Sequence, residues 1–143
     1  LMHQPDCHDA LGFFVHMMAD RFCPMHVAHL DDQGGNKVRM KWFGSNTNLH
    51  SVWDSKLIEY KGFSYTEYAS YLHDVYGHQC TDILRMSEGE TLLHTYHVTD
   101  AIYQYHSTWS GNTYHYAYQW VETAEYQMYM AGIRLAKHLN ELF

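Results

Sequence analysis

The chain has 143 residues, the length of one ordinary domain, and we expect it to bury a single core. Nine Lys and Arg stand against sixteen Asp and Glu, and the net charge of -7 argues against a basic module that binds nucleic acid through its own side chains. Chemistry on phosphates would therefore need another source of positive charge, and bound metal ions are the usual one. No stretch approaches the roughly 18 consecutive apolar residues of a membrane-spanning helix, so we expect no membrane partner.

Histidine and cysteine carry different signals in this composition. Thirteen histidines are many for this length, but a single histidine is usually a surface or hydrogen-bonded core residue, and only spacing can mark a site. The three cysteines, Cys7, Cys23 and Cys80, are odd in number and lack the close pairing of a zinc ribbon or a Cys-x-x-Cys redox site. They therefore specify neither a metal site nor a complete disulfide framework.

The first third of the chain predicts a helix and then a strand. Between residues 9 and 21 apolar side chains recur at helical spacing with few breaks, which predicts a largely buried helix, and Pro24 then ends it. After the Gly-Gly turn at 34–35, basic and apolar residues alternate over residues 37–42. This alternation predicts a short strand with one basic, solvated face, in a hairpin or an edge ribbon.

Helical patterns dominate the remainder. Residues 46–60 predict a short helix capped by an asparagine, and the segments that begin at Ser64 and Ser87 each have Glu three residues later, the capping-box arrangement. A long apolar-periodic run from residue 114 onward predicts a long last helix with one interior glycine, Gly132. The expected fold is an all-α bundle interrupted by one short β segment.

Two identical spacings carry the candidate chemistry. His16 and Asp20 are four residues apart, as are His50 and Asp54, so each pair projects from one face of its predicted helix. His26 follows just after the proline that ends the first helix. These five side chains offer the nitrogen and oxygen donors that zinc accepts. A metal ion would also compensate the charge of the two carboxylates, which are seldom buried among apolar residues otherwise. A His–Asp hydrogen bond within each pair, which needs no metal, is the alternative that spacing leaves open.

Four motifs decide between these alternatives. In order along the chain, "FFVHMMADRFCPMH", "GGNKV", "NLHSVWD" and "AGIRLAKHLNE" resemble the zinc-dependent S1/P1 nuclease family. The resemblance implies a helical bundle of the phospholipase C/P1 nuclease type with up to three zinc ions in a cleft. It makes His16 a ligand of one ion, and Asp20 the catalytic carboxylate that bridges this ion to a second. It places His26, His50 and Asp54 at the remaining ion.

The resemblance also implies a function. Family members hydrolyse phosphodiester bonds of single-stranded DNA and RNA through zinc-activated water, and many also remove a 3'-phosphate from nucleotides, so zinc would supply the positive charge that this acidic chain lacks. They are exported proteins, which implies secretion or a periplasmic location. A non-catalytic, zinc-binding helical protein that keeps the family fold is the alternative. A third possibility is a related three-zinc phospholipase, although "NLHSVWD" resembles the nucleases more closely.

The chain departs from the family at its N-terminal end. The family's N-terminal half, which supplies further zinc ligands, has no counterpart here, so residues 1–143 are interpreted as an S1/P1-like domain that is incomplete at the N-terminus. Only His16 and Asp20 would remain for the paired ions. Helices that pack on that half in the family would expose apolar surface, which predicts a complementary N-terminal fragment or self-association.

Overall fold

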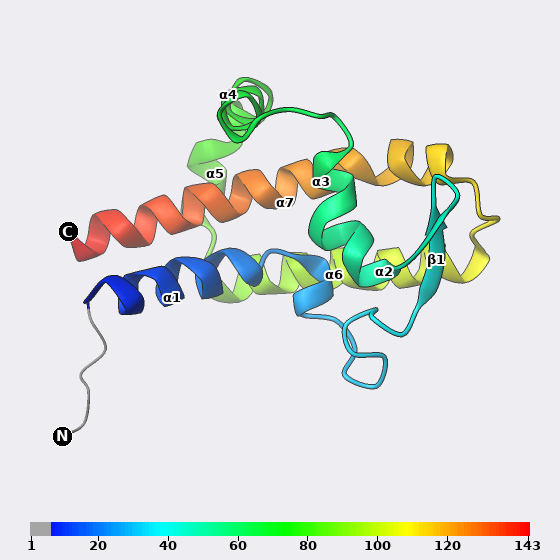
Figure 1. Cartoon of the computed structure of the whole chain (residues 1–143). Helices are drawn as coiled ribbons and strands as arrows, with labels where there is room; N and C mark the ends of the chain where they lie inside the picture. The colour runs from blue at the N-terminus through cyan, green and yellow to red at the C-terminus, as the bar shows by residue number, and fades with distance from the viewer. Residues whose placement is uncertain (1–6) are drawn as a thin grey trace.

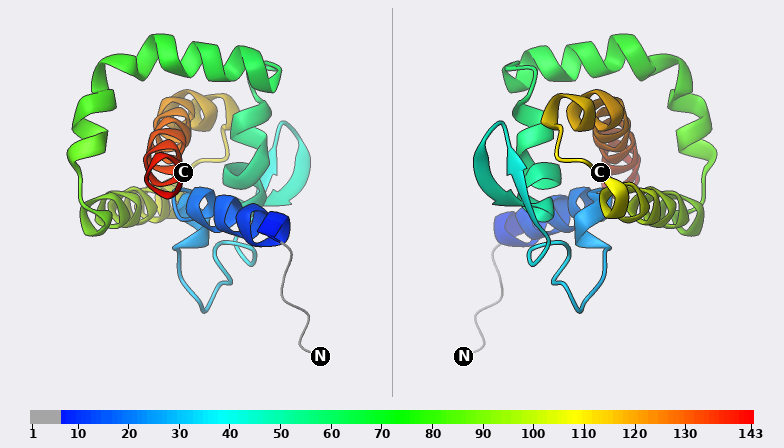
Figure 2. Two further views of the ribbon diagram at one scale, coloured as in Figure 1. Left: turned by 90° about the vertical axis from the view of Figure 1, so that its left-hand side faces the viewer. Right: turned by 90° about the vertical axis from the view of Figure 1, so that its right-hand side faces the viewer.

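A long helix, α7 (Thr113–Leu142), forms the axis around which the rest of the molecule is arranged (Figure 1). The computed structural model describes residues 7–143. Seen nearly end-on in Figure 2, α7 has α4 (Tyr65–Tyr76) and α5 (Cys80–Arg85) on one side and α1 (Cys7–Asp20) and α6 (Glu88–Thr108) on the opposite side. This confirms the mostly helical fold. None of the described helices is both long enough and apolar enough to cross a membrane.

Helix α1 forms where it was expected but is not largely buried. It packs on α7 along one side, while Phe13 and Met17 are 68% and 52% exposed. The prediction was wrong because apolar spacing reports the faces that a helix can bury, whereas the described residues cover one side of α1 only. An exposed apolar stripe remains on α1.

The short β segment is a hairpin. Strand β1 (Arg39–Trp42) pairs in antiparallel register with β2 (Ser45–Asn48), which supplies the partner that the sequence left unspecified. Met40 is buried and both neighbouring basic side chains are exposed, so the predicted basic face of the strand is confirmed. The hairpin leads directly into the next helical segment.

That segment is a continuous helical run with a wide turn in its middle. Asn48 caps α2 (Leu49–Ser51) by accepting a hydrogen bond from the backbone N–H of Ser51 at 2.8 Å. A π-helical turn, η2 (Val52–Lys56), follows, and α3 (Leu57–Glu59) ends the run. Turns of this kind occur mostly as local widenings of α-helices and are frequent at functional sites.

Both predicted capping boxes are present. Ser64 begins α4 and Ser87 begins α6, and in each the serine and the glutamate three residues later satisfy each other's backbone N–H groups. Between these helices lie a short 3₁₀ turn, η3 (Gly77–Gln79), and α5, which the sequence reading did not identify. Six residues without a side-chain cap are too few to show a clear apolar period.

Helix α6 buries an unexpected face. The apolar side chains Leu92, Leu93 and Tyr96 that mark the helix in the sequence are about half exposed, whereas the hydroxyls of Thr91, Thr95 and Thr99 lie against the protein interior. These three hydroxyls meet polar groups: Thr91 accepts from Arg21, Thr95 accepts from Gln127, and Thr99 donates to the carbonyl of Pro24.

Two apolar clusters form the core, one against the first third of α7 and the other against its middle. The cluster at the hairpin end contains Met25, Met40, Leu49, Val52, Trp53, Leu57, Ile102, Tyr116, Trp120 and Ala124. The cluster under α4 and α5 contains Phe22, Tyr68, Leu72, Ile83, Tyr129 and Met130. The segment between α1 and the hairpin contributes to both clusters, so its position is fixed from two directions.

Buried charges of α7 are paired. Glu125 is fully buried, lies 2.6 Å from the ammonium of Lys61 and accepts a hydrogen bond from Tyr68 at 3.1 Å. Arg134, also fully buried, pairs with Glu88 at the start of α6.

Glu88 also pairs with Arg21. Burial opposes its ionisation, but the hydrogen bonds from the two guanidinium groups outweigh this and lower the pKa of Glu88 to about 2. The ion pairs of Glu125 and Arg134 therefore connect α7 to Lys61 on one side and to α6 on the other.

Candidate metal centre

The segment that follows α1 carries two candidate ligands and is held in place by polar side chains. Gln127 donates a hydrogen bond to the carbonyl of Phe22 at 2.9 Å, and Thr99 donates to the carbonyl of Pro24 at 2.9 Å. Buried carbonyls require such donors, so these bonds fix the backbone on both sides of Cys23. The 3₁₀ turn η1 (Pro24–His26) then presents the imidazole of His26 to the pocket.

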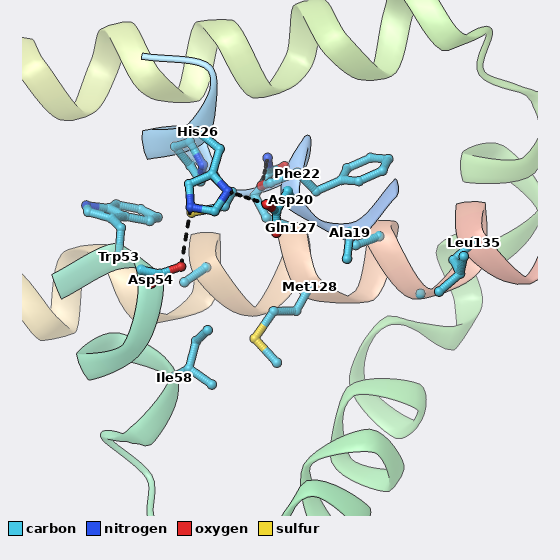
Figure 3. Close-up of a pocket in the computed structure, with 15 residues that line it drawn as sticks. Ala19, Asp20, Phe22, His26, Trp53, Asp54, Ile58, Gln127, Met128 and Leu135 are labelled. Carbon is cyan, nitrogen blue, oxygen red and sulfur yellow. Dashed lines mark hydrogen bonds and ion pairs between the residues drawn. The ribbon is translucent and has the colours of Figure 1, made fainter. Parts of the chain in front are cut away.

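His26 lies between two carboxylates from different elements (Figure 3). Its Nδ1 is 3.2 Å from Oδ2 of Asp20 at the end of α1, and its Nε2 is 3.4 Å from Oδ1 of Asp54 on the π-helical turn η2. His16 approaches the same oxygen of Asp20 at 3.1 Å but is 68% exposed. The two predicted His–Asp pairs therefore meet at His26.

The backbone fixes the ring of His50. Its Nδ1 lies 2.9 Å from the carbonyl oxygen of Gly34. Because a carbonyl only accepts, Nδ1 carries the proton and Nε2 keeps a free lone pair, the tautomer that binds a metal. The ring stacks on that of His26, with centroids 5.2 Å apart and planes inclined by 22°.

The Gly-Gly turn makes this contact possible. Gly34 has φ +62°, and a Cβ there would lie 2.4 Å from the carbonyl oxygen of Met25. Asp32 holds the turn by accepting from the N–H of Gly35 at 2.9 Å and from the hydroxyl of Tyr103 at 2.7 Å. Gly34 of the "GGN" motif thus supports a candidate ligand that lies 16 residues further along the chain.

A buried tryptophan sets the orientation of Asp54. Trp53, the preceding residue, is buried and donates from Nε1 to the hydroxyl of Tyr116 at 3.0 Å. With Trp53 anchored in the core, Asp54 faces the side of the turn that meets His26, and its side chain remains about half exposed. The wide turn η2 thereby places one residue in the core and the next in the pocket.

An apolar pocket of about 320 Å³ adjoins these ligands. Asp20, His26 and Asp54 form its polar rim, and Figure 3 shows Phe22, Ile58 and Met128 along its walls. Apolar pockets with a few convergent polar groups are the usual form of ligand sites. Helix α7 supplies one wall of the pocket.

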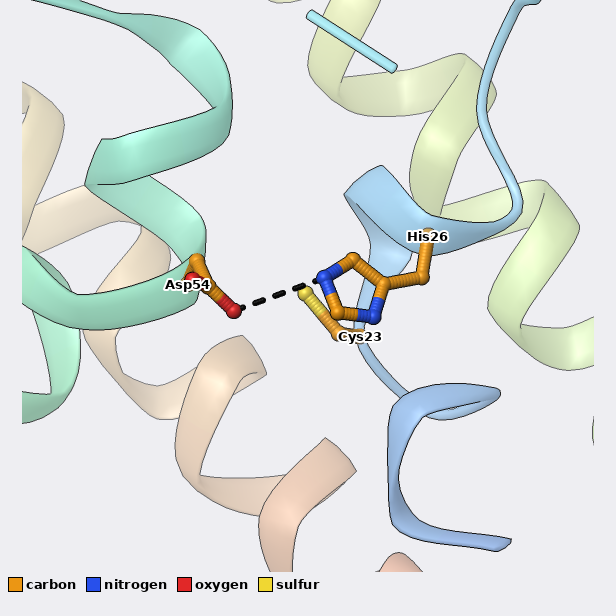
Figure 4. A group of neighbouring side chains, drawn as sticks. All are labelled: Cys23, His26 and Asp54. Carbon is orange, nitrogen blue, oxygen red and sulfur yellow. Dashed lines mark ion pairs between the residues drawn. The ribbon is translucent and has the colours of Figure 1, made fainter. Parts of the chain in front are cut away.

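Cys23 is a candidate ligand that the sequence reading missed. Among the described residues, one ligand atom each of Cys23, His26 and Asp54 lies within 4.8 Å of the other two (Figure 4). Burial, with a smaller contribution from the carboxylate of Asp54, raises the pKa of the thiol to about 11. The signal in the sequence was the Cys-x-x-His spacing, which places the two side chains about one turn apart.

The family is established by comparison with known sequences. The family model described as S1/P1 Nuclease matches residues 2–143. The chain belongs to the S1/P1 nuclease family. Endonuclease 4 of Arabidopsis thaliana is 45% identical over 51 residues, which are 36% of this chain and 17% of that protein.

Other members of the S1/P1 nuclease family match to a similar extent. Endonuclease 2 of Arabidopsis thaliana is 43% identical over 51 residues, 36% of this chain and 18% of the relative. Nuclease S1 of Aspergillus oryzae is 39% identical over 51 residues, again 36% of this chain and 17% of the relative. The matched stretch therefore covers less than one fifth of the length of these nucleases.

The donor set fits the zinc that the family implies. Imidazole nitrogen, carboxylate oxygen and thiolate sulfur are the usual zinc ligands in proteins, and they converge here from two elements, the segment that contains η1 and the turn η2. The carbonyl of Gly34 holds His50 in a ligand tautomer, as expected for an outer partner of a metal-binding histidine. His50 itself stacks beside His26 and lies outside the group of three mutually close ligand atoms.

Proposed function

We propose that this S1/P1 nuclease chain takes part in metal-dependent hydrolysis of phosphodiester bonds in single-stranded DNA or RNA. The observation that supports this most directly is the position of His26, between the carboxylates of Asp20 and Asp54 at the rim of an apolar pocket. The endonuclease names of the relatives favour nucleic acid as the substrate.

Each candidate residue has a specific role in this proposal. His26, His50 and Asp54 hold one zinc ion, and His16 and Asp20 supply two ligands of a pair of further ions, with Asp20 as the catalytic bridging carboxylate. Bound zinc supplies a Lewis acid that lowers the pKa of water toward neutrality and offsets the charge of a phosphate. His50 is oriented for this role by Gly34, and Asp54 by the anchored Trp53.

In this proposal the substrate contacts the apolar pocket in addition to the metal ligands. A nucleobase has apolar faces, and the walls formed by Phe22, Ile58 and Met128 suit such a group when the phosphate lies at the carboxylate rim. The exposed basic strand face of β1 adds a small cationic surface to a chain of net charge -7. Removal of a 3'-phosphate uses the same arrangement, with one nucleotide as the substrate.

We also propose that a partner covers the apolar side of α1. Phe13 and Met17 are exposed on the helix that ends at Asp20, so a complementary segment or a second copy that packs there would also approach His16 and Asp20. Additional ligands for the paired ions would come from that partner. A secreted or periplasmic location accompanies this proposal.

The test combines zinc analysis with hydrolysis of single-stranded DNA. The chain is expected to hold zinc after purification and, when a partner covers α1, to cleave single-stranded DNA in a manner that a chelator abolishes and added zinc restores. Bound zinc without hydrolysis would instead identify a non-catalytic zinc-binding protein. Absence of zinc binding, or hydrolysis that is indifferent to chelation, would refute the proposal.

A further inference from the structure

Cys23 lies at the same point in space as the ligands His26 and Asp54. It precedes His26 by three residues and lines the pocket beside the 3₁₀ turn η1. One ligand atom from each of the three side chains lies within 4.8 Å of the other two, and Figure 4 shows the sulfur at the same end of the imidazole as the Asp54 carboxylate. A single ion can therefore be reached by all three groups.

We propose that the sulfur of Cys23 is a ligand of the zinc ion held by His26 and Asp54. The inference rests on the proposed zinc site and adds a donor to it. The three side chains come from two elements that contact each other, the segment after α1 and the π-helical turn η2. The ion then has a sulfur, a nitrogen and an oxygen donor from protein side chains.

The surroundings of the sulfur support this assignment. The carbonyls on either side of Cys23 accept hydrogen bonds from Gln127 and Thr99, so the backbone that carries its side chain is held in place. With Nε2 of His26 toward the ion, Nδ1 faces the carboxylate of Asp20 at 3.2 Å. A carboxylate behind a metal-binding histidine is the usual outer partner, and it fixes the ring and raises its basicity.

A sulfur donor changes which metals the site prefers. Carboxylate and imidazole ligands alone accept hard and borderline ions, whereas a thiolate shifts the preference toward soft ions such as Cd²⁺. The chain is therefore expected to bind Cd²⁺ and Zn²⁺ in preference to Mn²⁺, and Cys23→Ser is expected to lose more affinity for Cd²⁺ than for Zn²⁺. The loss for Zn²⁺ should be about tenfold or more, since even outer partners of a metal site contribute that much.

Cobalt substitution tests the sulfur bond directly. The zinc-free 143-residue chain is titrated with Co²⁺, and a thiolate-to-cobalt charge-transfer band in the near ultraviolet is expected. Cys80→Ser serves as the matched control and should keep the band, whereas Cys23→Ser should lose it and still bind cobalt through the remaining ligands. A band that persists in Cys23→Ser, or cobalt bound by the unmodified chain without any band, would overturn the inference.

A second measurement needs no variant at Cys23. The unmodified chain is alkylated with iodoacetamide in the presence of zinc and again after chelation, and the modified cysteines are located by mass spectrometry. Zinc is expected to protect Cys23 and to leave the modification of Cys80 unchanged. Equal alkylation of Cys23 in both conditions would overturn the inference.

The two proposals fail in different ways. Zinc bound with normal hydrolysis, but with no cobalt–sulfur band and no protection of Cys23, would refute the sulfur ligand and leave the nuclease proposal intact. A chain that binds neither zinc nor cobalt would refute both.

Discussion

The Gly34→Ala substitution tests how the Gly-Gly turn supports the candidate metal centre. Alanine must adopt φ +62° at this position, and its Cβ would lie 2.4 Å from the carbonyl oxygen of Met25. Because that contact involves backbone, it is relieved only by moving the turn. The carbonyl of Gly34, which holds Nδ1 of His50 at 2.9 Å, moves with it.

Gly62→Ala is the control that separates the effect of the left-handed backbone conformation from the effect of the clash with Met25. Gly62 has φ +68°, close to that of Gly34, but a Cβ there meets no atom within 4 Å. The left-handed conformation alone should cost about 1–2 kcal/mol of unfolding free energy at either site. The backbone clash should add about 1–3 kcal/mol at Gly34. Gly34→Ala is therefore expected to lose about 2–5 kcal/mol in total.

Urea unfolding and zinc titration together measure both effects. Gly34→Ala is expected to unfold at a lower urea concentration than Gly62→Ala and, under folding conditions, to bind zinc about 10- to 100-fold more weakly than the unmodified chain. Gly62→Ala should bind zinc normally. Equal unfolding free energies and equal zinc affinities for the two variants would refute the reasoning.

Three further predictions concern the interactions around the site. Lys61→Met should lower the free energy of unfolding by about 3–5 kcal/mol, because it leaves a fully buried carboxylate without its cation, and Glu125→Gln should lower it by less. A larger loss for Glu125→Gln than for Lys61→Met in urea unfolding would contradict this. Glu88→Gln should lower the free energy of unfolding by about 1 kcal/mol at pH 7, a small loss because solvent screens the partly exposed carboxylate. The pKa of Glu88 is lowered to about 2, so this stability is complete above about pH 4.5 and lost as the pH falls toward 2; an equally steep pH dependence of unfolding in the variant would contradict it. Thr99→Val removes the donor to the carbonyl of Pro24 and should cost about 1 kcal/mol and weaken zinc binding, whereas Thr108→Val, whose hydroxyl bonds within its own helix, should leave zinc affinity unchanged; equal zinc titrations would contradict this.

The sequence predicts well those elements that carry their own local signals. The capping boxes at Ser64 and Ser87 predict where two helices begin, because in each box the serine and the glutamate satisfy backbone N–H groups only three residues apart. The spacing of His16 with Asp20 predicted a pair that lies 3.1 Å apart, and Asp54 of the second predicted pair lies near His26. Their role as metal ligands stays a prediction. Spacing could not predict that His26 lies between Asp20 and Asp54, because this depends on how η1 packs against η2.

The sequence does not predict features that depend on tertiary contacts. Apolar residues mark α6 as a helix, yet Thr95 and Thr99 form its inner face because they meet carbonyls and Gln127 from elsewhere in the chain. The exposure of Phe13 on α1 depends in the same way on what surrounds that helix. The cysteine pattern does not predict Cys23 as a ligand, because that pattern concerns pairs of cysteines and the neighbours of Cys23 are a histidine and an aspartate.

Anomalous diffraction at the zinc edge, from crystals of the chain grown with zinc, tests the central claim most directly. The account predicts a zinc peak between the imidazole of His26 and the carboxylate of Asp54, with His50 beside it. Crystals that show zinc only on exposed histidines, or no peak near His26 at all, would contradict the account.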